Sequence, residues 1–276
     1  MAYNLLKGKK GLIFGALNEN SIAWKAAERA YEEGAQIMLT NAPAAKRLGS
    51  VEELAKKCCT EVIYADATNL EDLEKLVQTT MNRFDSKIDF VLHSIGMSPN
   101  VRKEIPYDNI NYEYYLKTLD VSALSFHKII QTCYKFDAIN EWGSIVALTY
   151  IASTRTLYGY NDMADAKAAL ESIARSFGYI YGREKKVRIN TISQSPTNTL
   201  ASSVIKGFTS LLDFSERMSP LGNADALECA NYVITLFSDL TRKVTMQNLY
   251  HDGGFSSMGM SQEAMVQYDK SFEECK

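Results

Sequence analysis

The sequence predicts an α/β protein: one domain built on a doubly wound parallel sheet of about seven strands, with helices on both faces. Short apolar runs alternate with longer segments of helical periodicity from the first residues nearly to the last. Most of these runs are continuously apolar, as in strands that are buried on both faces. No Pro/Ser-rich linker, charge block or internal repeat interrupts the pattern, so residues 1–276 are expected to form a single domain.

The strands and helices can be assigned in chain order. A helix is expected over 21–33, where alanines recur at helical spacing, and another over 69–84, where Glu71 and Asp72 occupy the first turn. Beyond Phe255 the residues become polar and Met-rich, so 256–276 is expected to form a surface tail or to pack on a neighbouring subunit. The expected strands are the apolar runs 10–15, 36–40, 61–65, 90–93, 144–148, 187–192 and 247–251.

The composition argues against several classes of partner and site. The 30 Lys and Arg residues against 33 Asp and Glu give a net charge of -3, so no basic field recruits nucleic acid or an anionic membrane. The apolar stretches fall short of the ~20 residues that span a bilayer. The N-terminus has no signal-peptide cleavage pattern, so we expect no membrane insertion and a cytoplasmic location.

The cysteines give no sign of a disulfide framework or a zinc site. They form an odd set with no C-x-x-C pair, and reduced thiols with packing roles are expected. No metal site is therefore predicted. The set consists of Cys58, Cys59, Cys133, Cys229 and Cys275.

The turn after the first strand is a candidate phosphate site. Gly15 ends the strand and Ser21 stands where it can cap the next helix, whose N-terminus favours a pyrophosphate. The G-x-G-x-x-G spacing is absent, because Gly15 is the only glycine of the turn. Taken alone, the turn fits a dinucleotide or no ligand equally well.

The ends of the next two strands carry the signals for the adenosine half of a dinucleotide. After the second strand the chain reads Thr40-Asn41-Ala42-Pro43, with neither the acid that binds a ribose nor the Arg that binds a 2′-phosphate. Lys46 and Arg47 follow, and a solvated helix start is the better interpretation of them than a phosphate contact. NADH is therefore favoured, with NADPH possible. Asp66 can accept from an adenine amino group or cap a helix.

Tyr160 and Lys167 are the candidate chemical groups. On a helix, seven residues rise ~10.5 Å and return to nearly the same face, so these side chains cannot pair directly. An ordinary short-chain carbonyl reductase spaces these residues by four, close enough for the ammonium to lower the phenol pKa; here that position is Met163. The spacing therefore favours conjugate reduction, in which charge develops on a thioester oxygen remote from the attacked carbon.

In this interpretation Tyr160 donates to that oxygen, Lys167 holds the cofactor ribose, and Tyr150 lines the pocket beside the nicotinamide. The alternative is aromatic packing for both tyrosines and a solvated lysine.

Several motifs in the same order resemble the bacterial enoyl-acyl-carrier-protein reductases of the short-chain dehydrogenase/reductase superfamily. They are Gly15 with Ser21-Ile22-Ala23, His93-Ser94-Ile95-Gly96, Tyr150, Tyr160-x6-Lys167, Val187-Arg188-Ile189-Asn190 and Asp252-Gly253-Gly254-Phe255. The resemblance implies a Rossmann-like fold, reduction of trans-2-enoyl thioesters in type II fatty-acid synthesis, an acyl carrier protein as partner, and a homotetramer.

The resemblance also assigns roles to single residues. Tyr160 and Lys167 correspond to the catalytic pair, with Tyr150 as a catalytic and substrate-pocket tyrosine. The candidate cofactor-binding residues are Gly15, Ser21, Ile22, Asp66, Ala67, Ile95, Lys167, Thr197, Thr199 and Ala201. The candidate substrate-binding residues are Ser98, Tyr150, Tyr160, Met163 and Phe208.

The chain departs from the family pattern after the sixth strand. Where the family commonly reads A-G-P-I-R-T-L-A, this chain reads Gln194-Ser195-Pro196-Thr197-Asn198-Thr199-Leu200-Ala201. Thr197 places a hydroxyl where an apolar side chain would pack on the nicotinamide, whereas Thr199 matches. Residues 203–212 should form the substrate-covering helix, with Phe208 facing the acyl chain. Only Lys206 supplies a positive charge there for an acidic carrier protein, because Thr209 and Ser210 replace basic residues.

Two other functions stay open. One is a ketone or alcohol dehydrogenase of the same fold. The other is a non-catalytic dinucleotide-binding sensor, suggested by the polar residues Ser195, Thr197 and Asn198 in the cofactor wall.

Overall fold

The computed structural model describes residues 2–48, 50–199 and 207–273. A seven-stranded sheet in the order β3-β2-β1-β4-β5-β6-β7 runs through the molecule, and every neighbouring pair is parallel. The predicted fold class and strand number are confirmed, and the strand order reverses between β1 and β4. The strands are β1 (Lys10–Phe14), β2 (Gln36–Asn41), β3 (Val62–Tyr64), β4 (Ile88–His93), β5 (Ile139–Thr149), β6 (Arg188–Gln194) and β7 (Asn248–His251).

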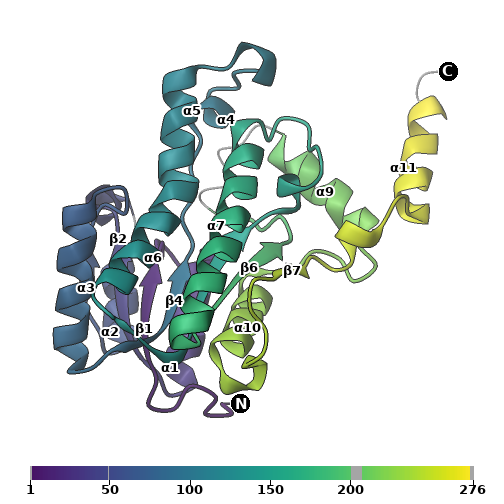
Figure 1. The fold of residues 1–276 in the computed structure, drawn as a ribbon. Helices are drawn as coiled ribbons and strands as arrows, with labels where there is room; N and C mark the ends of the chain where they lie inside the picture. The colour runs from purple at the N-terminus through teal and green to yellow at the C-terminus, as the bar shows by residue number, and fades with distance from the viewer. Residues whose placement is uncertain (1, 49, 200–206, 274–276) are drawn as a thin grey trace.

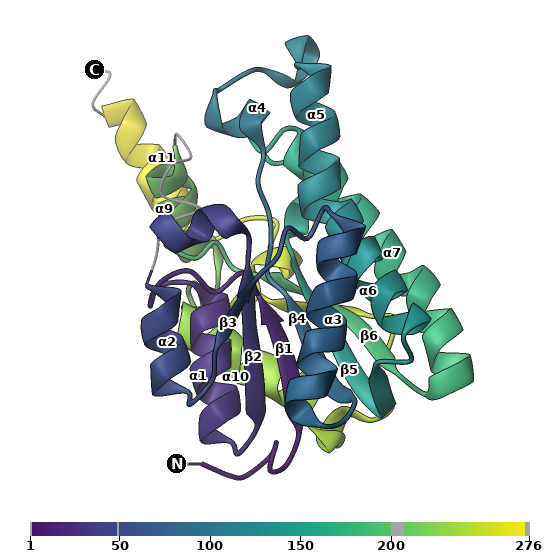
Figure 2. The ribbon, with the colours of Figure 1, turned by 90° about the vertical axis from the view of Figure 1, so that its left-hand side faces the viewer.

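Helices cover both faces of the sheet (Figures 1 and 2). On one face α1, α2 and α10 bury a core with the sheet, and on the other α3, α6 and α7 bury a second one. Strands β1, β2, β4, β5 and β6 contribute apolar side chains to both cores, which explains their apolar runs. The helices are α1 (Ile22–Glu32), α2 (Val51–Lys57), α3 (Leu70–Phe84), α4 (Pro99–Arg102), α5 (Tyr112–Leu119), α6 (Ser125–Lys135), α7 (Asp162–Lys185), α9 (Phe208–Met218), α10 (Ala226–Phe237) and α11 (Gln262–Glu273).

Short 3-10 helical turns and one π-helical turn join these elements. One of them, η3, is a π-helical turn that links α5 directly to α6. These turns are η1 (Pro43–Arg47), η2 (Tyr107–Asn109), η3 (Asp120–Leu124), η4 (Ile151–Ser153), η5 (Asp239–Thr241) and η6 (Phe255–Ser257).

Three elements differ from the sequence-based expectation. Strand β5 begins at Ile139, five residues before the predicted start, because a register shift opposite Ile88 and Phe90 lets a polar stretch join the strand. Helix α9 begins at Phe208, after Gly207 with φ 75, and so starts later than the predicted 203–212 helix. Residues 203–206 lie outside the described residues. The predicted tail contains α11, which extends away from the sheet beside α9 (Figure 1).

Within the described ranges, no helix is long and apolar enough to cross a membrane, and no group of His, Cys, Asp and Glu side chains is arranged to hold a metal ion. The described cysteines are free thiols, of which Cys58, Cys133 and Cys229 are buried. Cys59 is exposed, so the expected packing role is wrong for that residue, because the chain turns outward after α2 with φ 50 at Cys59. Cys275 lies outside the described residues.

Candidate active site

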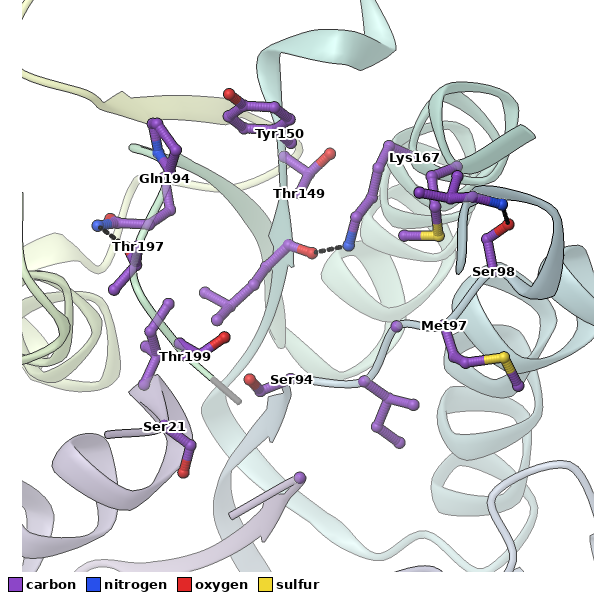
Figure 3. A pocket seen from close by; sticks show the side chains of 18 of the residues that line it. Ser21, Ser94, Met97, Ser98, Thr149, Tyr150, Lys167, Gln194, Thr197 and Thr199 are labelled. Atoms are coloured by element: carbon purple, nitrogen blue, oxygen red, sulfur yellow. Dashed lines mark hydrogen bonds between the residues drawn. The ribbon is translucent and has the colours of Figure 1, made fainter. Parts of the chain in front are cut away.

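A cavity of about 300 Å³ opens at the carboxyl ends of β1, β4, β5 and β6 (Figure 3). This edge, where the strand order reverses, is where doubly wound sheets bind ligands. Most of the predicted site residues meet there. Those that line the cavity are Gly15, Ser21, Ile22, Ile95, Ser98, Tyr150, Tyr160, Met163, Lys167, Thr197, Thr199 and Phe208.

Two of the described predicted residues do not line this cavity. Asp66 is exposed and Ala67 is buried, and both follow β3 at the edge of the sheet. Ala201 lies outside the described residues. The structure therefore does not bring Asp66 or Ala67 to the chemical end of the site.

The Gly15 turn needs a glycine for two reasons. Gly15 has φ 96, a left-handed conformation that strains other residues. A Cβ added there would lie 2.0 Å from the carbonyl oxygen of Ser94, at the end of β4. The backbone of the turn and the residue after β4 thus approach closely, and both Gly15 and Ser94 line the cavity.

Ser21 does not cap α1, contrary to the sequence prediction. Its hydroxyl donates to the carbonyl of Asn18 at 2.7 Å and accepts from the N–H of Leu17 at 3.3 Å. The Ser21 side chain closes the preceding loop and makes no cap hydrogen bond to the first turn of α1. These uncapped N–H groups suit a phosphate.

Side chains at the ends of β2 and β3 form hydrogen bonds within the protein. The Asn41 amide donates to the carbonyl of Ala16 at 2.8 Å, which ties the end of β2 to the Gly15 turn. Asp66 accepts from the N–H and the hydroxyl of Thr68, and Asn69 rather than Asp66 caps α3. The alternative of a helix cap is therefore wrong for Asp66. Lys46 is exposed in the last turn of η1, as the solvated-start interpretation expects.

Lys167 projects from α7 into the cavity and is buried rather than solvated. Its Nζ donates to the carbonyl of Leu148 at 2.8 Å, the bond drawn dashed beside it in Figure 3. Burial lowers the pKa of this ammonium from 10.5 to about 8, and the Glu171 carboxylate one turn later opposes the shift. Glu171 is itself buried and accepts from the Thr149 hydroxyl at 2.7 Å.

The two tyrosines pack against each other at the cavity wall. The ring centroids of Tyr150 and Tyr160 lie 5.1 Å apart, and the ring planes are inclined by 52°. Burial raises the pKa of both phenols, with a smaller contribution from Asp252 at Tyr150 and from Tyr150 at Tyr160. Both phenols are therefore neutral hydrogen-bond donors near pH 7.

The helical geometry assumed for Tyr160 and Lys167 is wrong. Helix α7 begins only at Asp162, and Asn161 before it has φ 43 and ψ -133. Tyr160 therefore lies in the turn that precedes the helix, where Asn161 reverses the chain. Its position depends on that turn and not on two turns of α7.

The wall after β6 is polar, but its polar groups bond within the protein. The Thr197 hydroxyl donates to the carbonyl of Ser195 at 3.0 Å and lies 3.4 Å from the Gln194 amide nitrogen (Figure 3). Oε1 of Gln194 in turn lies 2.9 Å from Nδ1 of His251. The hydroxyl expected to disturb the nicotinamide wall is thus engaged by its own segment.

Several polar residues at or near the site had no role assigned to them from the sequence. Ser122, in the η3 turn, accepts from the N–H of Met97 at 2.9 Å and so fixes the strand-to-helix loop after β4. His93 is fully buried, and burial lowers its pKa to about 3, so its ring stays neutral. Asp162, discussed below, was also missed. A polar residue placed among the buried positions of a helix is the sequence signal that could have found Asp162 and Glu171.

The cavity lies where the sheet reverses its strand order, and a buried lysine from the helix after β5 reaches into it beside two neutral phenols. Fold and site together define a short-chain dehydrogenase/reductase. The family model described as Enoyl-(Acyl carrier protein) reductase matches residues 15–256, so the chain belongs to the enoyl-acyl-carrier-protein reductase family.

Known relatives agree with this assignment. The NADH enoyl-acyl-carrier-protein reductase 1 of Rhizobium meliloti is 33% identical, over 94% of this chain and 94% of that protein. The crystal structure of the FabI–NADH complex from Alistipes finegoldii is 71% identical, with a TM-score of 0.95, over 96% of this chain and 94% of that one. A second FabI structure from the same organism is 68% identical, with a TM-score of 0.92, over 99% of both chains.

Proposed function

We infer that this chain is an NADH-dependent enoyl-acyl-carrier-protein reductase of fatty-acid synthesis, and that it reduces the carbon–carbon double bond of trans-2-enoyl thioesters. The observation that carries this inference is the pair of neutral phenols, Tyr150 buried and Tyr160 half-buried, in one cavity with a buried lysine at the reversal point of the sheet. We also propose roles for single residues of this site.

Tyr160 is the proposed hydrogen-bond donor. When hydride reaches the β-carbon of an enoyl thioester, negative charge develops on the thioester oxygen. A phenol whose pKa burial has raised keeps its proton at neutral pH and can donate to that oxygen. Tyr150 packs on the Tyr160 ring and limits the directions in which the phenol can point.

Lys167, Gly15 and the start of α1 are the proposed cofactor-binding groups. NADH, when bound, supplies the hydride. The Lys167 ammonium uses one donor on the carbonyl of Leu148 and keeps two more for ribose hydroxyls. The close approach of Gly15 to Ser94 and the uncapped N-terminus of α1 fit the pyrophosphate. Ser21, Ile22, Ile95, Thr197 and Thr199 line the same cavity and complete this surface.

The acyl chain is proposed to lie against the apolar part of the cavity. Met163 from α7 and Phe208 from α9 line it, and Ser98 forms part of the wall after β4. The start of α9 at Phe208 agrees with a substrate-covering role for this segment. The acyl carrier protein as partner, a homotetrameric assembly and a cytoplasmic location remain proposals. Free thiols at the described cysteines fit a reducing compartment.

The test compares two thioesters and two cofactors. Crotonyl-CoA and acetoacetyl-CoA are offered separately with NADH and with NADPH, and the loss of absorbance at the nicotinamide band is followed. Oxidation of NADH with crotonyl-CoA alone is expected. Oxidation only with acetoacetyl-CoA would favour a ketone reductase, and cofactor binding without turnover of either thioester would favour a sensor.

A further inference from the structure

Asp162 is a fully buried carboxyl group at the start of α7, close to the cavity but not among the residues that line it. Its Oδ1 accepts from the Ser98 hydroxyl at 2.6 Å. Its Oδ2 accepts from the Asn100 amide at 2.9 Å and lies 2.7 Å from the Thr118 hydroxyl. These partners lie in the loop before α4, in α4 and in α5. One carboxyl group therefore joins three segments that are more than 40 residues away in the chain.

Two of the partners are themselves fixed in orientation. The Ser98 hydroxyl accepts from the N–H of Val101 at 3.0 Å, so its proton is directed at Asp162. The Asn100 amide oxygen accepts from the N–H of Asn111 at 3.2 Å, which leaves the amide nitrogen to face the carboxyl group. Ser98, Asn100 and Thr118 are all buried, so water cannot replace a lost bond at little cost.

The Tyr160 turn is anchored by the same residue. Tyr160 lies two residues before Asp162, and its carbonyl accepts from the N–H of Met163 at 3.2 Å. Between them Asn161 adopts φ 43, and its amide donates to the carbonyl of Ile105 at 2.6 Å. A left-handed residue of this kind persists only where its surroundings hold it. The hydrogen bonds of the Asp162 and Asn161 side chains hold Asn161 in this conformation.

Ser98 connects this network to the cavity. Ser98 and Tyr160 both line the cavity, and the Asp162 carboxyl group contacts Ser98 directly and Tyr160 through the backbone. Movement of the carboxyl group would therefore shift the wall after β4 and the phenol relative to each other. The chemistry proposed for Tyr160 depends on where its hydroxyl lies relative to the substrate held by that wall.

We propose that Asp162 is a positioning residue for the reduction, which sets the place of the Tyr160 phenol by binding Ser98, Asn100 and Thr118. It touches neither substrate nor cofactor. The proposal rests on the donor role proposed for Tyr160. It differs from a purely structural role because its effect on turnover must pass through the Tyr160 hydroxyl.

The test measures kcat, KM for crotonyl-CoA and the NADH dissociation constant in single and double variants. Asp162→Val should lower kcat by roughly 10- to 100-fold, as expected for a displacement of about 1 Å at the reacting groups. NADH binding should change by less than about twofold, because the Gly15 turn and Lys167 are not touched. In a Tyr160→Phe background the same change should lower kcat by less than about threefold.

Two further variants and a control complete the design. Asp162→Asn keeps an oxygen for Asn100 and Thr118, and should retain kcat within about threefold. Thr118→Val keeps the side-chain shape and removes one bond, so it should lower kcat by on the order of threefold even if Asp162→Val does not fold. The matched control is Asp165→Val. Asp165 also lies in the first turn of α7, but it accepts from the exposed Tyr107 hydroxyl.

The outcomes separate the two hypotheses. If Asp162→Val lowers kcat equally with and without the Tyr160 hydroxyl, or if the Asp165 control lowers it as much, the positioning role is wrong while the donor role stands. If Thr118→Val leaves kcat unchanged, the network does not act on turnover. If Tyr160→Phe alone lowers kcat less than about threefold, the donor role is wrong and this proposal falls with it.

Discussion

Replacing Lys167 by methionine should stabilise the ligand-free protein at pH 7 and at the same time weaken NADH binding. The Nζ group is buried, and an ammonium there has lost its water without gaining a close carboxylate partner. A methionine of similar length fills the same space with no charge. It also removes the donors that would hold the cofactor ribose. Stability and binding should therefore move in opposite directions.

The size of the stability change follows from the pKa. Burial lowers the Lys167 pKa from 10.5 to about 8, a difference of about 2.5 pKa units, which corresponds to roughly 3 kcal/mol of native-state cost. The variant also loses the bond from Nζ to the carbonyl of Leu148, worth about 1 kcal/mol. The free energy of unfolding should thus rise by about 2 kcal/mol at pH 7.

The stability gained by Lys167→Met should shrink as pH rises above the pKa of the buried lysine. Below about pH 8 the lysine is charged in both the folded and the unfolded protein, so the full cost of the buried ammonium is present. Between about pH 8 and 10.5 the folded protein loses the proton first, and wild-type stability rises relative to the variant. The advantage of methionine should therefore shrink as pH rises through this interval.

Urea unfolding of both ligand-free proteins at pH 7, 8, 9 and 10 measures the difference, and a fluorescence titration with NADH measures binding. Other titrating groups cancel in the comparison. Lys75→Met, at an exposed position of α3, is the matched control and should change neither quantity. A Lys167 variant that is less stable at pH 7, whose advantage does not vary with pH, or that binds NADH with unchanged affinity would contradict these expectations.

Three further predictions concern the same site. Gly15→Ala should weaken NADH binding by about tenfold or more, because the alanine Cβ would lie 2.0 Å from the Ser94 carbonyl oxygen. The control is Gly8→Ala, at a glycine that also has positive φ but where an added Cβ would have no atom within 4 Å. This variant should bind NADH with wild-type affinity. Tyr150→Phe should leave the free energy of unfolding in urea unchanged or raised, because the buried hydroxyl has no hydrogen-bond partner among the described residues. A loss of more than about 1 kcal/mol would show that the hydroxyl has a partner. Burial holds the His93 pKa near 3, against 6.5 in the unfolded chain, so the free energy of unfolding should fall as pH drops below about 6.5. In a His93→Leu variant this fall should be smaller. An equal fall in urea titrations of both proteins would show that His93 is not its cause.

The sheet could be predicted from the sequence because each buried strand leaves a local signal. Continuous apolar runs marked all seven strands, and most ends were placed within two residues. The start of β5 was missed because its first residues are polar and join the strand only through pairing with β4. That pairing is a contact between distant segments, which no local pattern contains.

The residues that line the site could be predicted from the sequence, but their arrangement in space could not. The motifs placed Tyr150, Tyr160 and Lys167 together, and the structure brings all three to one cavity. The helical argument for Tyr160 failed because Asn161 adopts a left-handed conformation and delays the start of α7. A polar residue at a buried position of α7 was a signal for Asp162 itself, but its partners could not be named from the sequence, because they lie more than 40 residues upstream.

The most direct test of the account is the turnover of crotonyl-CoA by Tyr160→Phe under saturating NADH. Loss of one donor to a developing oxyanion should lower kcat by ~10²–10³, with only a modest change in KM, since the phenol is proposed to act mainly in the transition state. A kcat within about threefold of the wild-type value would contradict the account, because the phenol would then not be the group that stabilises the thioester oxygen.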